Sequence, residues 1–453
     1  MLRIKTTALV VLAMCGCQRE ASEPRADAAP VPTSKSASTQ PAADQPNPPT
    51  PNPARGIANM DLQVDVGGRR AIAELSFEPG AAGASCGFVA DLELARVDHA
   101  GAKLPFRRDG DTLHLALPAS STLEQVRVEY VIPDVDLRLG WLANGSTLVW
   151  PDGCGRVFPC HPQPADGLTF QLELTGVPEG LTAVYPRQVQ TQTPAYVVAW
   201  AVDEFTRIDL GATEAGTQIA AWVRPGEEAA AREGTATLRA GFEFFEQTYG
   251  AYAFGPEAGS VIVDWRGQAY GGMEHHPYWH VDVTELADQE VHLHEAAHGW
   301  FGDGVRIRCW EDFILSEGTT SYLSARAVEA TSGPEAASRT WADFRDRLDR
   351  LQSGPHSKLA WFDGCNEHDV IADGLFRNAY MRGAFFLRAV EARVGRESLD
   401  AALRAVYQRH VGAAPAGVAD LLTEIHTQSG YDPRPCANAW LRSETLPLSL
   451  DSC

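Results

Sequence analysis

Two histidines four residues apart, His294 and His298, are the residues whose types and spacing best suit chemistry. On an α-helix such side chains share one face, so both imidazoles can bind one metal ion. Glu317, further along the chain, can supply a third ligand from a following helix. Two histidines and a carboxylate leave one position of a tetrahedral zinc ion open to water, which is typical of catalytic rather than structural zinc sites.

Glu295 directly follows the first histidine and is therefore expected beside the metal. Its carboxylate can accept a proton from zinc-bound water, whose pKa zinc lowers to about 7. Two histidines and a carboxylate also serve iron, but Glu295 favours hydrolytic zinc. We expect His292 to lie outside the site because it points to nearly the opposite side of the helix. We predict one zinc ion per chain, with two surface histidines that bind no metal as the alternative.

Two longer segments carry a family resemblance. Residues 291–303 (VHLHEAAHGWFGD) and 310–322 (WEDFILSEGTTSY) resemble the zinc segments of the aminopeptidase N-like zinc metallopeptidases, the gluzincin family called peptidase family M1. Residues 271–275 (GGMEH) resemble the Gly-x-Met-Glu-Asn exopeptidase motif of that family, and residues 380–383 (YMRG) resemble its Tyr-x-Lys-Gly segment. The resemblance implies a zinc-dependent aminopeptidase whose substrates are peptides with a free amino terminus.

The resemblance and the residue chemistry together assign roles. Glu274 offers a negative charge to the α-ammonium group of a substrate, and Tyr380 can donate a hydrogen bond to the oxyanion from a helix over residues 375–393. The β-branched run 261–265 reads as a strand, and the glycines after it would let a peptide pair there by strand addition. The expected substrate-binding residues are Gly271, Gly272, Met273 and Glu274.

Some positions depart from the family pattern. Pro162 replaces an expected aspartate after Phe-Pro-Cys at 158–160, His275 replaces the motif asparagine, and Trp150 falls near a Glu or Gln that helps to hold the substrate amino terminus. These departures leave open a zinc endopeptidase or an epoxide hydrolase on the same scaffold. A non-catalytic peptide-binding lipoprotein is a further alternative, although the retained Glu295 and Tyr380 argue against it.

Other polar residues near the zinc motif have weaker assignments. A metal-bound imidazole normally donates its second N–H to a carboxylate or a carbonyl. The candidate carboxylates are Asp303, Glu311 and Asp312, each of which could equally be a surface group. The spacing of His275, His276 and His280 fits no helix face, so we do not expect a second metal there.

The amino-terminal segment indicates export. Residues 1–16 hold two basic residues and a short apolar run, which resembles a lipoprotein-type signal peptide, and Cys17 is the candidate lipidation site. Residues 17–55 are rich in Pro, Ala and Ser and are expected to form a disordered tether. The chain is therefore expected to be exported and held on a bacterial membrane, periplasmic or at the cell surface, by a lipid anchor only. A signal peptide without lipidation is the alternative.

The sequence after the tether, residues 56–453, predicts an α+β protein. Short alternating runs over 56–202 argue an N-terminal antiparallel β domain, and helical patterns dominate 203–453, which suits a thermolysin-like, mainly helical catalytic domain with a small sheet. Larger members of the family continue into a helical carboxy-terminal domain, so this chain is expected to be a short form. The expected helices beside the zinc helix are 227–249, 316–330, 335–351, 375–393 and 398–410.

Cysteine content and charge add two expectations. In an oxidising compartment three pairs are plausible, Cys154 with Cys160, Cys309 with Cys365 and Cys436 with Cys453, and the odd count leaves at least one thiol free. The formal net charge of −21 without a basic cluster excludes nucleic acid as an expected partner. Nothing in the sequence indicates the oligomeric state.

Overall fold

The computed structural model describes residues 55–89, 92–133, 139–150, 153–265, 271–353, 359–362, 364–365, 375–447, 449–450 and 453. The predicted signal peptide, Cys17 and all but the last residue of the tether lie outside these ranges. Within them, no helix is both long enough and apolar enough to cross a membrane.

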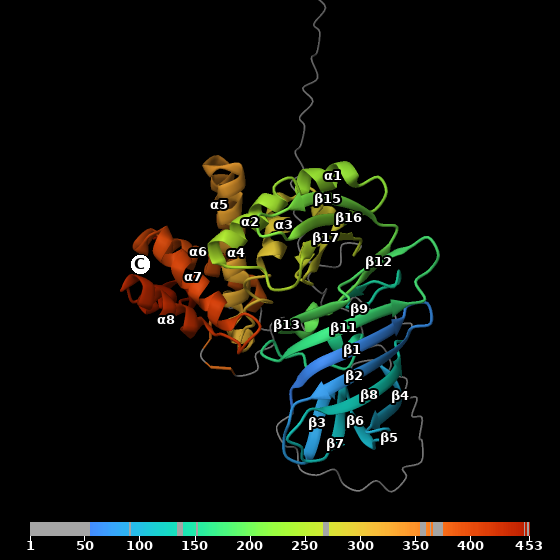
Figure 1. Cartoon of the computed structure of the whole chain (residues 1–453). Helices are drawn as coiled ribbons and strands as arrows, with labels where there is room; N and C mark the ends of the chain where they lie inside the picture. Colours follow the sequence, from blue (N-terminus) through green and yellow to red (C-terminus); the bar gives the residue numbers. More distant parts are fainter. Residues whose placement is uncertain are drawn as a thin grey trace, which may run out of the picture. The chain divides into compact units, whose positions relative to one another are not determined.

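A seven-stranded sheet dominates the first part of the described chain (Figure 1). Its strands in spatial order are β13 (Gln188–Pro194), β11 (Gly167–Thr175), β1 (Ile57–Asp65), β2 (Arg70–Phe77), β8 (Glu124–Val131), β4 (Glu93–His99) and β5 (Ala102–Lys103). Neighbouring strands run antiparallel except β1 and β11, which are parallel. In β8 the buried Val126, Val128 and Tyr130 alternate with Arg127 and Glu129, as expected for a strand with one face on a core.

Smaller elements complete this β-rich part. A three-stranded sheet joins β3 (Gly83–Phe88), β7 (Thr112–Leu117) and β6 (Phe106–Asp109). Two hairpin-sized sheets pair β9 (Gly140–Trp141) with β10 (Thr147–Leu148), and β12 (Thr182–Val184) with β14 (Ala201–Asp203). The 3₁₀ turns are η1 (Gly153–Arg156) and η2 (Ala195–Val197).

A five-stranded sheet supports the candidate site. Its order is β15 (Thr206–Ala212), β16 (Gln218–Val223), β17 (Glu257–Val263), β19 (Tyr278–Asp282) and β18 (Gly272–Met273). The predicted strand at 261–265 is β17, but both of its edges are paired, with β16 and β19. The edge strand next to β19 is β18, which consists of the motif residues Gly272 and Met273, so a peptide that pairs at the motif would join β18.

The helices are α1 (Glu228–Gly234), α2 (Leu238–Tyr249), α3 (Gln289–Ala297), α4 (Thr319–Ser332), α5 (Pro334–Gln352), α6 (Leu375–Val394), α7 (Arg396–His410), α8 (Val418–Ser429) and α9 (Arg434–Leu441). The patterns at 335–351, 375–393 and 398–410 are confirmed as α5, α6 and α7, whereas α8 and α9 were not predicted. The pattern at 227–249 is two helices separated by a turn at 235–237, and Gly234, the last residue of the first helix, lies directly against the Leu286 carbonyl.

Two clusters of buried apolar residues organise these elements, one in the β-rich part and one around the helices and the five-stranded sheet. The predicted α+β class is thus confirmed (Figure 1). Trp150 and Leu148, although early in the chain, belong to the second cluster. The domain boundaries given above stay predictions.

Candidate active site

Helix α3 holds both histidines of the predicted metal site. Asp288 caps its first turn by accepting a hydrogen bond from the Glu290 amide, and His298 directly follows the helix with a still-helical backbone (φ −59°, ψ −23°). His294 and His298 therefore point to the same side, and their Nε2 atoms lie 3.3 Å apart. The two histidines therefore share one side of the helix, as their spacing of four residues predicts.

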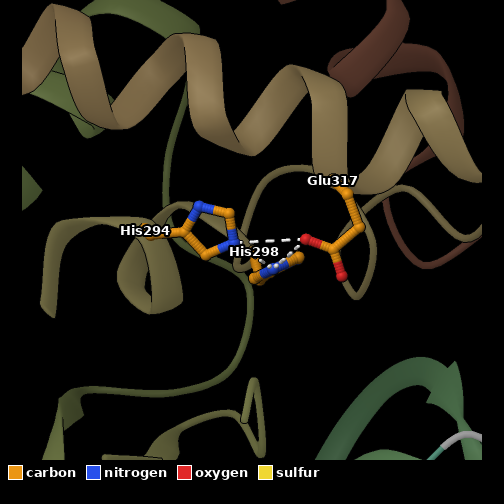
Figure 2. Close-up of side chains that lie close together, drawn as sticks. All are labelled: His294, His298 and Glu317. Carbon is orange, nitrogen blue, oxygen red and sulfur yellow. Dashed lines mark hydrogen bonds and ion pairs between the residues drawn. The ribbon is translucent and has the colours of Figure 1, made fainter. Parts of the chain in front are cut away.

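Glu317 comes from a π-helical turn rather than from the α-helix expected at 316–330. This turn, η5 (Ile314–Gly318), precedes α4 and follows the 3₁₀ turn η4 (Trp310–Asp312). The Glu317 Oε2 atom lies 3.1 Å from His294 Nε2 and 3.3 Å from His298 Nε2 (Figure 2). Single π turns inside helices are frequent at functional sites, and this one changes the direction in which Glu317 points relative to α4.

These three atoms fit a tetrahedral zinc ion. Bonds of about 2.0 to 2.1 Å place the corners of a tetrahedron about 3.3 to 3.4 Å apart, close to the separations observed. Burial alone would raise the pKa of Glu317, but the interactions with His298 and His294 lower it to about 2. Burial alone would lower the pKa of His298, but Glu317 and Glu274 raise it well above its ordinary value. The surroundings of the His298 ring therefore favour a positive charge.

We call His294, His298 and Glu317 the triad. Glu295 is buried beside it. One of its carboxylate oxygens, one of Glu274 and a nitrogen of His298 all lie within 4.8 Å of one another. Burial and the neighbouring Glu274 and Glu317 raise the pKa of Glu295 well above its ordinary value, against the opposing effect of His298. A carboxylate with a raised pKa can both accept and return a proton, as a general base requires.

Glu274 follows the edge strand β18 directly, so the strand and the triad share one site. It is buried, and burial is the main cause that raises its pKa. Gly272 lies so close to Glu295 that a Cβ on it would stand 2.4 Å from the Glu295 Oε1 atom. Glycine at this position thus leaves the room that the Glu295 carboxylate occupies.

Tyr380 reaches the triad from α6. Its ring stacks on His294 with centroids 5.8 Å apart and an interplanar angle of 13°, and it meets Phe313 edge-on at 6.2 Å. Tyr380 as a whole is partly buried. Burial of the hydroxyl, together with the Glu317, Glu274 and Glu295 carboxylates, raises its pKa well above the ordinary value, so the phenol keeps its proton and can donate it in a hydrogen bond.

His276 is a positioning residue that the sequence did not reveal. Its Nε2 atom lies 2.8 Å from the Glu295 backbone carbonyl, and its Nδ1 atom lies 2.7 Å from the Tyr252 hydroxyl. Burial lowers its pKa to about 3, so the ring is neutral: Nε2–H donates to the carbonyl and Nδ1 accepts from the tyrosine. His276 therefore links the segment after β18 to the zinc helix.

The other predicted neighbours have different partners. His298 Nδ1 donates to the Phe301 carbonyl at 3.0 Å, so its second nitrogen uses a backbone group instead of a carboxylate. Asp312 accepts from Arg308 and from the Val418 amide, which fastens α8. Asp303 is buried without a hydrogen-bond partner among the described residues.

The remaining histidines behave largely as expected. His292 bonds Ser260 and the Leu286 carbonyl, away from the triad, which confirms its exclusion. His275 and His280 pack against each other, but no third metal ligand joins them within the described part of the chain. The ring of Trp150 contacts Phe313, which in turn contacts Tyr380, so an aromatic side chain occupies this side of the site.

Disulfides brace the surroundings of the site. The three predicted pairs, Cys154 with Cys160, Cys309 with Cys365 and Cys436 with Cys453, are confirmed. Cys309 immediately precedes η4, so its bridge ties the segment that leads to Glu317 to the chain before α6. The bridge thereby links the sequence neighbourhoods of Glu317 and Tyr380.

Comparisons with known proteins find similar sequences over much of this chain. The sequence model described as the peptidase family M1 domain matches residues 260–440. Aminopeptidase M1-B of Oryza sativa subsp. japonica is 27% identical over 330 residues, which are 65% of this chain and 36% of that protein. Aminopeptidase N of Streptomyces lividans is 26% identical over 324 residues, 64% of this chain and 36% of that protein. The chain thus spans about a third of the length of these curated relatives.

Solved structures share the fold over most of the chain. The M1 zinc metallopeptidase of Deinococcus radiodurans superposes with a TM-score of 0.72 and 20% identity, covering 87% of this chain and 95% of that one. A mutant of the same enzyme, bound to a Tyr-Ser-Ala substrate, gives 0.73 and 20% identity, with coverage of 89% and 99%. Residues 260–440 thus resemble the peptidase family M1 domain, and the fold over most of the chain is that of the solved M1 zinc metallopeptidases.

Proposed function

We propose that the protein is a zinc-dependent aminopeptidase that releases amino-terminal residues from peptides. The observation that carries the proposal is the convergence of three metal-ligand atoms within 3.3 Å of one another, with Glu295 and Glu274 beside them. A bound zinc ion would polarise the scissile carbonyl and lower the pKa of a water molecule. His294, His298 and Glu317 would hold one such ion per chain.

The side chains divide the remaining work. Glu295 accepts a proton from the attacking water and returns it to the leaving amine, which its raised pKa favours. The Tyr380 hydroxyl donates a hydrogen bond to the carbonyl oxygen as negative charge develops there. Glu274 binds the α-ammonium group, and the backbone of Gly272 and Met273 pairs with the substrate strand, with Gly271 leaving room for its approach. Anchoring the amine beside the metal limits cleavage to the first peptide bond.

The test is hydrolysis of aminoacyl-fluorophore substrates, free and N-acetylated, by the zinc-loaded full chain and by a Glu295→Gln variant. We expect cleavage of free-amine substrates only, and a loss of about 100-fold or more in the variant, because the general base is removed. Cleavage of acetylated substrates would favour the endopeptidase alternative. If the wild type hydrolyses no substrate at full zinc occupancy, the proposal is rejected and a non-catalytic peptide-binding protein is favoured.

We further propose that the chain is exported and anchored to a bacterial membrane through lipidated Cys17, without a nucleic-acid partner. The support is the resemblance of residues 1–17 to a lipoprotein signal. Labelling of cells with a palmitate analogue should mark the wild type and not a Cys17→Ala variant. An unlabelled wild type released into the soluble exported fraction would indicate a signal peptide without lipidation.

A further inference from the structure

Two glycines on different helices touch where the chain brings Glu317 and Tyr380 together. A Cβ on Gly318 would stand 2.6 Å from the Gly383 Cα and 2.9 Å from the Ala379 carbonyl oxygen. A Cβ on Gly383 would stand 2.5 Å from the Gly318 Cα. The atoms that meet are backbone atoms on both sides, so no side chain can rotate away to make room.

Both glycines are neighbours of functional residues in their own elements. Gly318 directly follows Glu317 and ends the π turn η5, so the two residues face directions roughly 90–100° apart, one toward the histidines and one toward α6. On α6, Gly383 lies three positions after Tyr380 and therefore on nearly the same face. The backbone contact and the two functional side chains thus lie within one helical turn of each other.

Neither helix has an obvious alternative position. The residues of η5 are buried, and so are Ala379, Met381, Arg382 and Ala384 of α6. Arg382 further ties α6 to α9 through a hydrogen bond from Nε to the Trp440 carbonyl. Tyr380 itself lies between His294 and Phe313, so a shift of α6 moves the phenol relative to the triad.

We infer that the Gly318–Gly383 contact sets the spacing between the metal ligand Glu317 and Tyr380, and that these glycines are positioning residues for the reaction. The inference rests on the proposed function. A methyl group at either glycine requires the two backbones to separate by about 1 Å to reach ordinary carbon–carbon contact. A displacement of that size at a catalytic group can cost about 100-fold in rate.

The test is a double-mutant cycle with Gly383→Ala and Tyr380→Phe, measured as kcat at saturating zinc. We expect each single variant to lose about 100-fold, and the double variant to lose less than about threefold beyond Tyr380→Phe, because the methyl acts through the tyrosine. Gly395→Ala is the matched control: it lies just after the same helix with φ of 84°, and its methyl would meet open space. It should lower the melting temperature and leave kcat unchanged.

A second measurement does not depend on turnover. Gly318→Ala places the methyl on the residue bonded to Glu317, so we expect zinc affinity, measured by chelator competition, to fall about tenfold, a loss of the size seen when groups that support a metal ligand are altered. The inference is overturned if Gly383→Ala costs the same factor with and without the Tyr380 hydroxyl, or leaves kcat unchanged. It is also overturned if neither glycine variant folds, since the contact would then serve the fold as a whole. An inactive wild type rejects the proposed function instead.

Discussion

Gly272→Ala tests whether the position of the Glu295 carboxylate limits the reaction. The Cβ of an alanine at this position would stand 2.4 Å from Glu295 Oε1 and 2.5 Å from both Cδ and Cγ. Ordinary contacts of this kind need about 3.5 Å, so the carboxylate must retreat by about 1 Å. Glu295 is the end of a flexible side chain and can retreat without moving the backbone. We therefore expect the variant to fold.

The expected loss falls on the rate. A displacement of about 1 Å at a catalytic group can cost about 100-fold, equivalent to about 2.7 kcal/mol of transition-state stabilisation. We expect kcat for a free-amine substrate to fall by about that factor. Zinc content should stay at the wild-type value because no ligand is touched, and the melting temperature should change little.

The adjacent glycine provides the matched control. A Cβ on Gly271 would meet Glu285 Cγ at 3.2 Å and Val291 at 3.8 Å, which small adjustments can relieve. Gly271→Ala should therefore keep most of the wild-type kcat at saturating substrate, and any loss from its place in the substrate-binding motif should appear in KM. The reasoning is refuted if Gly272→Ala retains more than half of the wild-type kcat, or if Gly271→Ala loses as much as Gly272→Ala.

Two further predictions concern stability. Replacing a cysteine pair by serine should lower the free energy of unfolding more when the disulfide closes a longer loop. We expect losses of about 4 kcal/mol for 309–365, about 3 kcal/mol for 436–453 and about 2 kcal/mol for 154–160, whose sequence separations are 56, 17 and 6. Urea unfolding measures these losses, and equal losses would contradict the prediction. Burial lowers the pKa of His280 to about 3, below the unfolded value of about 6.5, so the unfolded chain takes up a proton first and stability falls as the pH drops from about 6.5 toward 3. Between pH 8 and pH 5 the wild type should lose about 2 kcal/mol more than His280→Gln, and parallel pH profiles of the two would show that His280 does not contribute.

Local patterns in the sequence predict what depends on neighbours along the chain. His294 and His298 converge because helical periodicity alone brings residues four apart to one face, and Glu295 follows from the same geometry. The helices α5, α6 and α7 are predicted within one or two residues because their apolar spacing is regular. Two of the cysteine pairs, 154–160 and 436–453, follow from short separations, and pairing in general follows from an oxidising compartment.

Elsewhere the expectation and the structure differ for reasons of long-range packing. The run 261–265 has the composition of a strand, but β16 and β19 pair with both of its sides, so the edge strand at the substrate motif is β18 instead. The pattern at 316–330 reads as a simple α-helix, but its first residues belong to the π turn that holds Glu317. The second nitrogen of His298 meets the Phe301 carbonyl, one of the two acceptor types that the chemistry allowed, instead of any of the three candidate carboxylates.

Residue types and their spacing along one helix are therefore enough to predict a zinc site, its base and the class of chemistry, because these depend on 3.6-residue periodicity and on the ligand preferences of the metal. The distances from the two histidines to Glu317, Tyr380 and Glu274 depend on contacts between segments distant in sequence. These contacts are the Gly318–Gly383 pair, the edge strand β18 and the hydrogen bond from His276 to the zinc helix. Such contacts are set by how segments distant in sequence pack and hydrogen-bond, which no pattern local to one segment encodes.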